Sequence, residues 1–216
     1  MPNLIIFEEK EVPALGLNRE KIPDIEKMKE FFFDEEFEVL QQLPSIEHIF
    51  STNKVSLLYP GCGTDILTPL LYLEKITPQI EHVTLHFVDI SDSLAMLKTI
   101  LHQVGVSFAQ VEEIDAESGG GRGIQFHWQH MLVTLYFHVQ NIARFLHEAP
   151  NFHIYFEKCF RIMKDRMPEY EAVIYEKLAM NGLLISDSGF EERGLEKIKV
   201  DSRLSAYNEM MVGRKR

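Results

Sequence analysis

An apolar segment that ends in a Gly-X-Gly turn constrains the fold of this chain most. Residues 55–59 form a run typical of a buried β-strand, and Gly61-Cys62-Gly63 follows almost directly. One strand and one helix further on, the apolar run 83–88 ends at Asp89. In α/β sheets a glycine turn lets the backbone approach a nucleoside, and a carboxylate at the tip of the next strand accepts hydrogen bonds from ribose hydroxyls. The pair therefore predicts a site for a nucleoside-containing cofactor.

The balance of charge is acidic. The 216 residues include 22 basic and 33 acidic side chains, which give a formal net charge of −11. A protein that neutralises many phosphates needs a basic face, and the one basic run here is Arg214-Lys215-Arg216. Non-specific binding of nucleic acid is therefore disfavoured, and a small-molecule or protein substrate fits the charge better.

Length and cysteine content set the broad class. A chain of this size is expected to form one domain with additions. No apolar stretch is long enough to cross a bilayer, and residues 1–9 lack the layout of a signal peptide. Cys62 and Cys159 make no disulfide framework, and no cysteine and histidine cluster predicts a metal site. We expect a reduced cytoplasmic protein with no metal and no membrane segment, and a homo-oligomer is compatible with these features.

The first 50 residues are predicted to be an N-terminal extension. Residues 1–23 read as a short strand or an arm. Apolar residues at steps near three, four and seven predict one amphipathic helix over 24–42, which either covers one end of the sheet or serves as a partner surface or substrate lid. Pro44 ends this helix, and Ser45 can cap a short second one that ends near Phe50.

Strands and helices alternate after residue 50, which predicts right-handed crossovers and a mostly parallel sheet. Helices are expected at about 65–73 and 93–104, between and after the two strands named above. The alternation of strands and helices is interrupted at about 105–140, where apolar runs flank the glycine-rich segment 119–123. This pattern predicts a hairpin with a flexible tip, inserted before or merged with the third sheet strand.

The alternation resumes in the last third of the chain. A strand is predicted at 152–156 and a helix at 169–180, which Asn181-Gly182 would end. The strand 183–185 would follow. Two short antiparallel strands, at 196–200 and 206–212, would close the sheet.

In this order of elements the chain resembles the class I S-adenosylmethionine-dependent methyltransferases, a Rossmann-like family, over roughly residues 45–216. The first motif of the family falls on residues 57–65, and the second falls on 87–91, with Met96-Leu97 after it. The ending 207–214 is similar to the closing hairpin of the family. The resemblance implies a doubly wound α/β domain at 51–216, with S-adenosylmethionine as cofactor and a small-molecule or protein methyl acceptor.

Two departures stand in the first motif. Tyr59 stands at the position where the family has an acid, and Asp65 stands at the position of its third glycine. Asp65 at the start of a helix favours the macrodipole, and it would either bind the amino group or sulfonium of the cofactor or only cap the helix. Tyr59 at a strand tip is expected to pack, with its hydroxyl reaching solvent. After the third strand, an amide would meet the adenine amino group. The cofactor-binding residues implied by the resemblance are Tyr59, Gly61, Gly63, Asp65, Asp89, Ile90, Gln140 and Asn141.

The catalytic residues are not fixed by the sequence. Methyl transfer from a sulfonium is an in-line displacement, so the protein mainly positions the reactants and excludes water. A general base is needed only where the acceptor is protonated. Glu157 and Asp187 are the candidates at the expected edge, and the alternative for Glu157 is a solvated acid paired with Lys158.

Two other functions stay open. The departures at Tyr59 and Asp65 are compatible with a non-catalytic protein of the same fold that binds a cofactor or partners. A nicotinamide-dependent oxidoreductase is disfavoured, because Asp65 would lie close to a pyrophosphate of the same charge.

Overall fold

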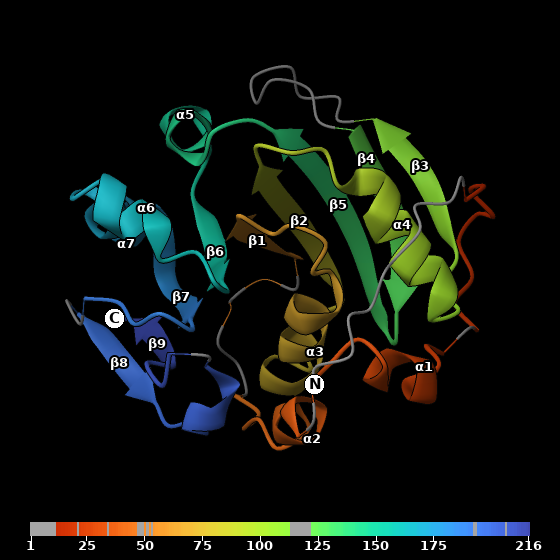
Figure 1. Cartoon of the computed structure of the whole chain (residues 1–216), viewed down its shortest axis with the longest axis horizontal. Coiled ribbons are helices and arrows are strands. Elements are labelled where there is room, and N and C mark those ends of the chain that lie inside the picture. Colours follow the sequence, from red (N-terminus) through yellow and green to blue (C-terminus); the bar gives the residue numbers. More distant parts are fainter. Residues whose placement is uncertain are drawn as a thin grey trace.

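A twisted sheet forms the centre of the computed structural model (Figure 1). The model describes residues 12–20, 22–33, 35–46, 50, 52, 54–112, 122–191, 194–205 and 207–216. In these ranges the sheet has nine strands in the order β3-β4-β5-β2-β1-β6-β7-β9-β8. The strands are β1 Lys54–Pro60, β2 His82–Asp89, β3 Phe108–Glu112, β4 Arg122–Trp128, β5 Met131–Val139, β6 Phe152–Glu157, β7 Leu178–Ser186, β8 Leu195–Ile198 and β9 Met211–Lys215.

The direction of the strands defines the fold class. β5, β2, β1, β6 and β7 run parallel to their neighbours in this central block. β3 and β4 extend one edge in antiparallel fashion, and β9 and β8 do the same at the other. This arrangement confirms the predicted Rossmann-like α/β sheet with antiparallel C-terminal strands.

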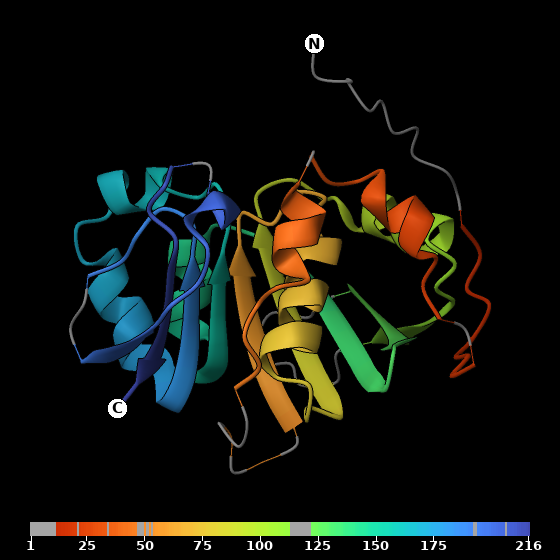
Figure 2. The ribbon, with the colours of Figure 1, turned by 90° about the horizontal axis from the view of Figure 1, so that it is seen from below.

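Helices cover both faces of the sheet. The described helices are α1 Ile25–Lys29, α2 Glu36–Leu40, α3 Leu67–Ile76, α4 Leu94–Gln103, α5 Ile142–Glu148, α6 Ile162–Arg166 and α7 Tyr170–Lys177, with a 3₁₀ turn η2 at Ser202–Leu204. α1 and α2 lie on the same side as α3 and α4 (Figure 2), and side chains of all four belong to one core cluster. α5 and α7 pack on the opposite face in a second cluster.

The long helix predicted over 24–42 is wrong, because the chain forms α1 and α2 with a break between them. Glu35 has a φ of +67°, so the backbone leaves the helical region there. The N–H of Asp24 donates to the carbonyl of Val104 after α4, while α2 packs against α3. A straight helix could not make both contacts.

The predicted hairpin region holds three strands. β3 and β4 pair antiparallel at the sheet edge, and β5 pairs antiparallel with β4 but parallel with β2. The third parallel strand is therefore merged with the added pair. The predicted tip falls mainly on residues 119–121, which lie outside the described residues, as do 1–11 of the predicted arm and 47–49 of the short helix after Ser45.

The predicted helix end at Asn181-Gly182 is wrong. α7 ends at Lys177, and β7 starts at once and includes both residues. Asn181 has a φ of +62°, and the pairing of β6 with β7 shifts register between Phe152 and Ile154. The pair therefore marks an irregularity within a strand. The final strand lies at 211–215 rather than 206–212.

Two further expectations concern the whole chain. The division into an extension at 1–50 and an α/β domain at 51–216 stays a prediction. Within the described ranges, every helix is too short or too polar to traverse a lipid bilayer.

Candidate functional site

The glycine turn and Asp89 lie side by side at the carboxyl edge of the parallel strands. The N–H of Gly61 donates to the carbonyl of Val88 at 2.8 Å, which ties the turn to β2. The N–H of Gly63 donates to Oδ2 of Asp89 at 3.0 Å, and that of Ser91 donates to Oδ1 at 3.0 Å. The carboxylate therefore holds the turn, and it keeps acceptor capacity for a further donor.

The two glycines of the turn have different surroundings. Gly61 has a φ of +60°, and a Cβ built on it would lie 2.1 Å from the ring of Phe160. Gly63 has a φ of +52°, and a Cβ there would meet nothing within 4 Å. Phe160 thus occupies the space over Gly61, and a ligand can approach the backbone on the Gly63 side.

This difference predicts unequal costs for the two alanine substitutions. Gly63→Ala is expected to lower the free energy of unfolding by about 1–2 kcal/mol, the cost of a left-handed residue with a Cβ. Gly61→Ala should cost at least about 1 kcal/mol more, because it also overpacks the ring of Phe160. Urea unfolding measures both. Gly105→Ala is the control, since Gly105 has a φ of +83° and open space around it. Equal costs at Gly61 and Gly63 would contradict the packing argument.

Asp65 connects the strand tip to the first turn of α3. The hydroxyl of Tyr59 donates to Oδ2 of Asp65 at 3.0 Å, and the N–H of Thr68 donates to Oδ1 at 3.1 Å. Tyr59 is 1% exposed, so the expectation that its hydroxyl reaches solvent is wrong. Burial, then the charge of Asp65, raises the pKa of Tyr59 well above its usual value, so the phenol stays a donor. The helix-capping contact of Asp65 is present, and its cofactor contact stays a prediction.

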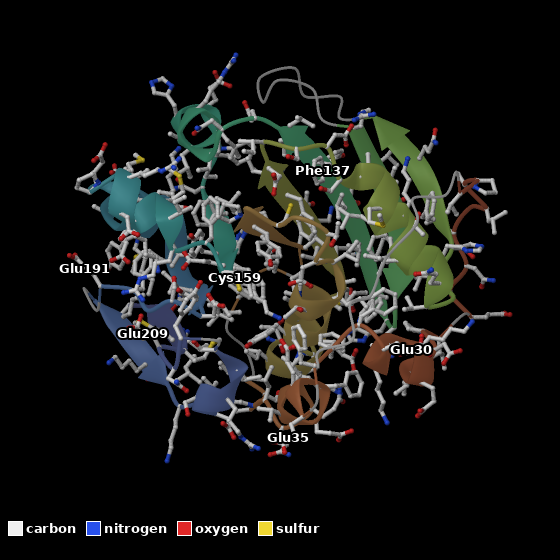
Figure 3. The ribbon with its side chains drawn as sticks, viewed as in Figure 1. Glu30, Glu35, Phe137, Cys159, Glu191 and Glu209 are labelled. Atoms are coloured by element: carbon white, nitrogen blue, oxygen red, sulfur yellow. The ribbon has the colours of Figure 1, made fainter. Side chains whose placement is uncertain are left out.

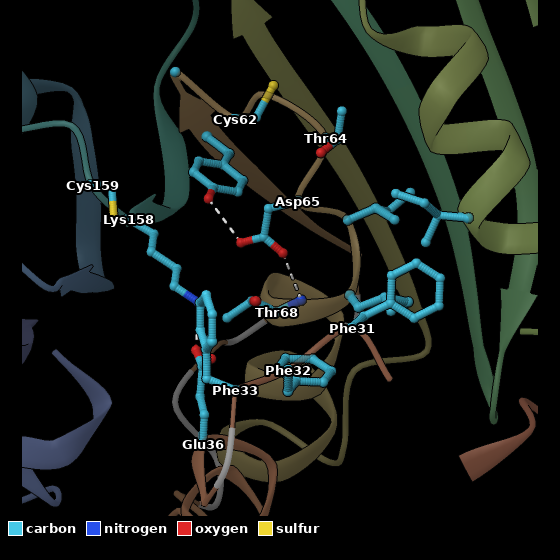
Figure 4. Close-up of a pocket in the computed structure, with 15 residues that line it drawn as sticks. Phe31, Phe32, Phe33, Glu36, Cys62, Thr64, Asp65, Thr68, Lys158 and Cys159 are labelled. Atoms are coloured by element: carbon cyan, nitrogen blue, oxygen red, sulfur yellow. Dashed lines mark hydrogen bonds and ion pairs between the residues drawn. The ribbon is translucent and has the colours of Figure 1, made fainter. Parts of the chain in front are cut away.

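A cavity of about 310 Å³ opens beside the turn (Figure 4). Tyr59, Gly61, Cys62 and Asp65 form one wall. The segment 31–33 between α1 and α2 brings three phenylalanines to the lining of this cavity, and the role of a substrate lid stays a prediction.

An ion pair spans the rim of this cavity. Nζ of Lys158, after β6, lies 2.5 Å from Oε1 of Glu36 in α2. Burial lowers the pKa of Lys158, but the nearby carboxylates Asp65 and Glu36 outweigh it and raise the pKa overall. The ammonium is therefore kept charged beside two carboxylates.

The thiols at this edge are not activated. Cys62 is 3% exposed, and burial, followed by the charge of Asp89, raises the pKa of its thiol far above the usual value. Cys159 lies beside the carboxyl end of β6 (Figure 3), and burial with the nearby Asp187 raises its pKa as well. Among the described residues, no group of three or more metal-ligating side chains converges.

On the other side of Asp89, an apolar surface is exposed. Ile90 is 78% exposed and Val139 is 50% exposed, and Val139 is the register partner of Asp89. The backbone N–H of Gln140 donates to the backbone carbonyl of Asp89 at 2.9 Å, which places the backbone of Gln140 beside that of Asp89. Oδ1 of Asn141 accepts from the N–H of Ala143 at 2.8 Å, so this side chain caps α5. Of the two predicted amides, the structure brings Gln140 closer to Asp89.

Glu157 is buried, so the alternative of a solvated acid paired with Lys158 is wrong. Its side chain is 0% exposed, and Oε1 lies 2.8 Å from Nζ of Lys164. The hydroxyls of Tyr155 and Ser186 donate to it at 2.6 and 2.9 Å. Successive residues of a strand point to opposite faces, which takes Lys158 to Glu36 and Glu157 to α6. Its catalytic role stays a prediction, and it does not line the 310 Å³ cavity among the described residues.

Asp187 acts on the backbone of the loop after β6. Both of its carboxylate oxygens accept from the N–H of Cys159 at 3.0 Å, and Cys159 has a φ of +57°. Burial raises the pKa of Asp187. This contact fixes the residue that follows Lys158 and precedes Phe160, so Asp187 positions the loop at the cavity. A catalytic role for Asp187 stays a prediction.

The sequence analysis missed the parts of the site that come from distant segments. Glu36 and the phenylalanines at 31–33 fall within the single helix predicted over 24–42, and no predicted element includes Phe160. The run of three phenylalanines followed by an acid was the available signal, because such a run has no counterpart in the polar face of an exposed helix.

Comparisons with known proteins add only a similarity of fold. No family model matches the sequence, and no curated protein matches it. Precorrin-8w decarboxylase from Methanobacterium thermoautotrophicum is 14% identical, with a TM-score of 0.36 over 68% of this chain and 56% of the other. A Listeria monocytogenes protein assigned as a class I S-adenosylmethionine-dependent methyltransferase is 14% identical, with a TM-score of 0.39 over 91% and 61%.

A third solved structure, a protein from Klebsiella pneumoniae assigned as an O-methyltransferase, is 14% identical, with a TM-score of 0.35 over 76% of this chain and 70% of the other. The chain thus spans only 56% and 61% of the length of the first two proteins.

Proposed function

We propose that this protein binds S-adenosylmethionine at the carboxyl edge of its sheet and transfers the methyl group to a small-molecule or protein acceptor. The observation that carries the proposal is the contact between Gly63 and Asp89, which joins an open glycine turn and a carboxylate in one cradle. Such a cradle suits a ribose, whose hydroxyls donate to the carboxylate while the sugar lies against the backbone.

The surface beside the cradle supports a nucleoside. Ile90 and Val139 present exposed apolar area on which a purine could lie, and Gln140 offers an amide next to Asp89. Exposed apolar side chains at the end of a buried sheet cost free energy in water, and a bound base would remove them from it.

The charges at the cavity favour the methionine part of this cofactor. Two carboxylates, Asp65 and Glu36, and one ammonium, Lys158, line it among the described residues. The cofactor carries an ammonium, a carboxylate and a sulfonium, so it has one net positive charge. This charge balances the net negative charge of the three charged side chains that line the cavity. Asp65 can accept from the ammonium, and Lys158 can pair with the carboxylate.

When bound, the cofactor would supply an electrophilic methyl group on its sulfonium. The part left to the protein is to orient the two reactants and to exclude water. Phe31, Phe32 and Phe33 place apolar rings on the wall opposite Asp65, which suits the second task (Figure 4). A nicotinamide dinucleotide fits less well, because Asp65 would repel its pyrophosphate.

Calorimetric titration with S-adenosylmethionine, its demethylated product and NAD⁺ tests the proposal. We expect the two sulfur nucleosides to bind with a Kd below about 100 μM and NAD⁺ not to bind at that level. Absence of binding by either sulfur nucleoside would overturn the proposal. Tighter binding of NAD⁺ would favour the oxidoreductase.

A further inference from the structure

A row of polar side chains crosses the amino-terminal half of the sheet. Gln125, Thr134, Thr84 and Ser56 are register partners on β4, β5, β2 and β1. His153 of β6 continues the row, since its ring bonds to Ser56. Parallel strands that are buried on both faces normally carry apolar residues. All five side chains are half-buried, so the row marks a part of this face that is not fully covered.

A cavity lies over this row. Its volume is about 280 Å³, and all five side chains of the row line it. Further along the same face, Leu58 and Tyr155 are buried under α5 and α7. The same strands thus change from apolar residues under helices to polar residues at a cavity. A break in the pattern of a sheet is typical of a site that serves function.

Hydrogen bonds within the row leave donors for a ligand. The backbone N–H of Ser56 donates to Nδ1 of His153 at 3.2 Å, so in the neutral ring the proton is on Nε2, which is a donor. Nε2 of Gln125 donates to Oγ1 of Thr134 at 3.0 Å, and the hydroxyl hydrogen of Thr134 remains able to donate.

The charge of the cavity lining is opposite to that of the protein. Lys54 and His82, which are register partners on β1 and β2, line one end of it. No aspartate or glutamate is among the described lining residues, although the whole chain has 33 acids and 22 bases. Several donors and the ammonium of Lys54, with no carboxylate beside them, favour an anion with oxygen acceptors.

We propose that this cavity binds a small molecule through an anionic oxygen group, a phosphate or a carboxylate. The site is separate from the cofactor cradle. Ser56 and Tyr59 are three positions apart in β1 and so point to opposite faces, and the two cavities share no described lining residue. The proposal therefore does not depend on the binding of S-adenosylmethionine.

Calorimetric titration of the full chain with inorganic phosphate and, separately, with acetate tests this proposal. We expect at least one of them to bind with a Kd below about 10 mM. The double variant Lys54→Gln/His82→Gln should weaken that binding at least about tenfold, because it removes the ammonium of Lys54 and the imidazole of His82. Binding of only phosphate or only acetate would identify the anionic group that the site prefers.

The matched control is Lys98→Gln/His102→Gln, which makes the same two changes on α4, away from the cavity. It should bind the anion within about twofold of the wild type, since distant sites act independently. Circular dichroism establishes that both double variants fold. Two results would overturn the proposal: no binding of either anion by the wild type, or equal binding by the two double variants.

Discussion

Replacing Asp89 by asparagine is expected to weaken binding of S-adenosylmethionine at least about tenfold. A hydrogen bond to a charged group contributes about 1.5–3 kcal/mol, and about 1.4 kcal/mol corresponds to a factor of ten in Kd. The amide oxygen can still accept from the N–H of Gly63, which now donates to Oδ2 of Asp89 at 3.0 Å. The amide NH2 cannot accept from the N–H of Ser91, which now donates to Oδ1 at 3.0 Å, so a loss of about 1 kcal/mol in the free energy of unfolding should accompany the weaker binding.

The control for this variant is Asp165→Asn on α6, which removes the same charge away from the cradle and should leave the Kd unchanged within about twofold. Asp89→Ala removes both the charge and the acceptor, so it should weaken binding at least as much and lower the melting temperature too. A Kd for Asp89→Asn equal to that of the wild type would rule out a ribose contact, even if the wild type binds the cofactor.

The parallel core could be predicted because its signals are local. The carboxyl ends of β1 and β2 are apolar, at 57–59 and 87–88, and each apolar stretch ends at a residue that interrupts it, Pro60 or Asp89. Burial on both faces removes the alternation of polar residues at these ends, so the apolar stretches mark central strands. The position of the glycine turn next to Asp89 then follows from the parallel pairing, since adjacent strands end at the same edge.

The chemistry of individual side chains could not be predicted in the same way. Tyr59 is expected from the sequence to expose its hydroxyl. In the structure the carboxylate of Asp65, six residues further along the chain, accepts a hydrogen bond from that hydroxyl at 3.0 Å. The phenol of Tyr59 thus links the tip of β1 to Asp65 at the start of α3. Sequence spacing alone does not tell which of two neighbouring polar groups will meet.

The remaining differences between the predicted and the observed contacts come from partners that are distant in the sequence. Glu157 is followed directly by Lys158, so a local pair was the natural expectation. Besides the nearby Tyr155, its partners include Lys164 on α6 and Ser186 on β7, which is 29 residues away and donates to the carboxylate at 2.9 Å. Only the pairing of β6 with β7 and the return of the chain through α6 bring these groups together, and neither is encoded in the segment around Glu157.

The buried pair predicts a large effect on stability. Lys164→Met is expected to lower the free energy of unfolding by about 3–5 kcal/mol, because it leaves the carboxylate of Glu157 buried without its cation. The carboxylate is 0% exposed and Nζ of Lys164 lies 2.8 Å from it. The same ammonium donates to the hydroxyls of Ser186 and Ser188 at 3.2 and 2.9 Å, so these contacts are lost as well.

Urea unfolding at neutral pH measures this cost, with Lys199→Met as the control, because Lys199 is an exposed lysine after β8. The control should change stability by less than about 0.5 kcal/mol. The double variant Glu157→Gln/Lys164→Met removes the charge together with its partner, so it should recover part of the stability lost in Lys164→Met. If Lys164→Met costs no more than the control, or if the double variant is less stable than Lys164→Met, then the ion pair does not hold α6 to the strands, and the hydroxyls of Tyr155 and Ser186 suffice to keep the carboxylate buried.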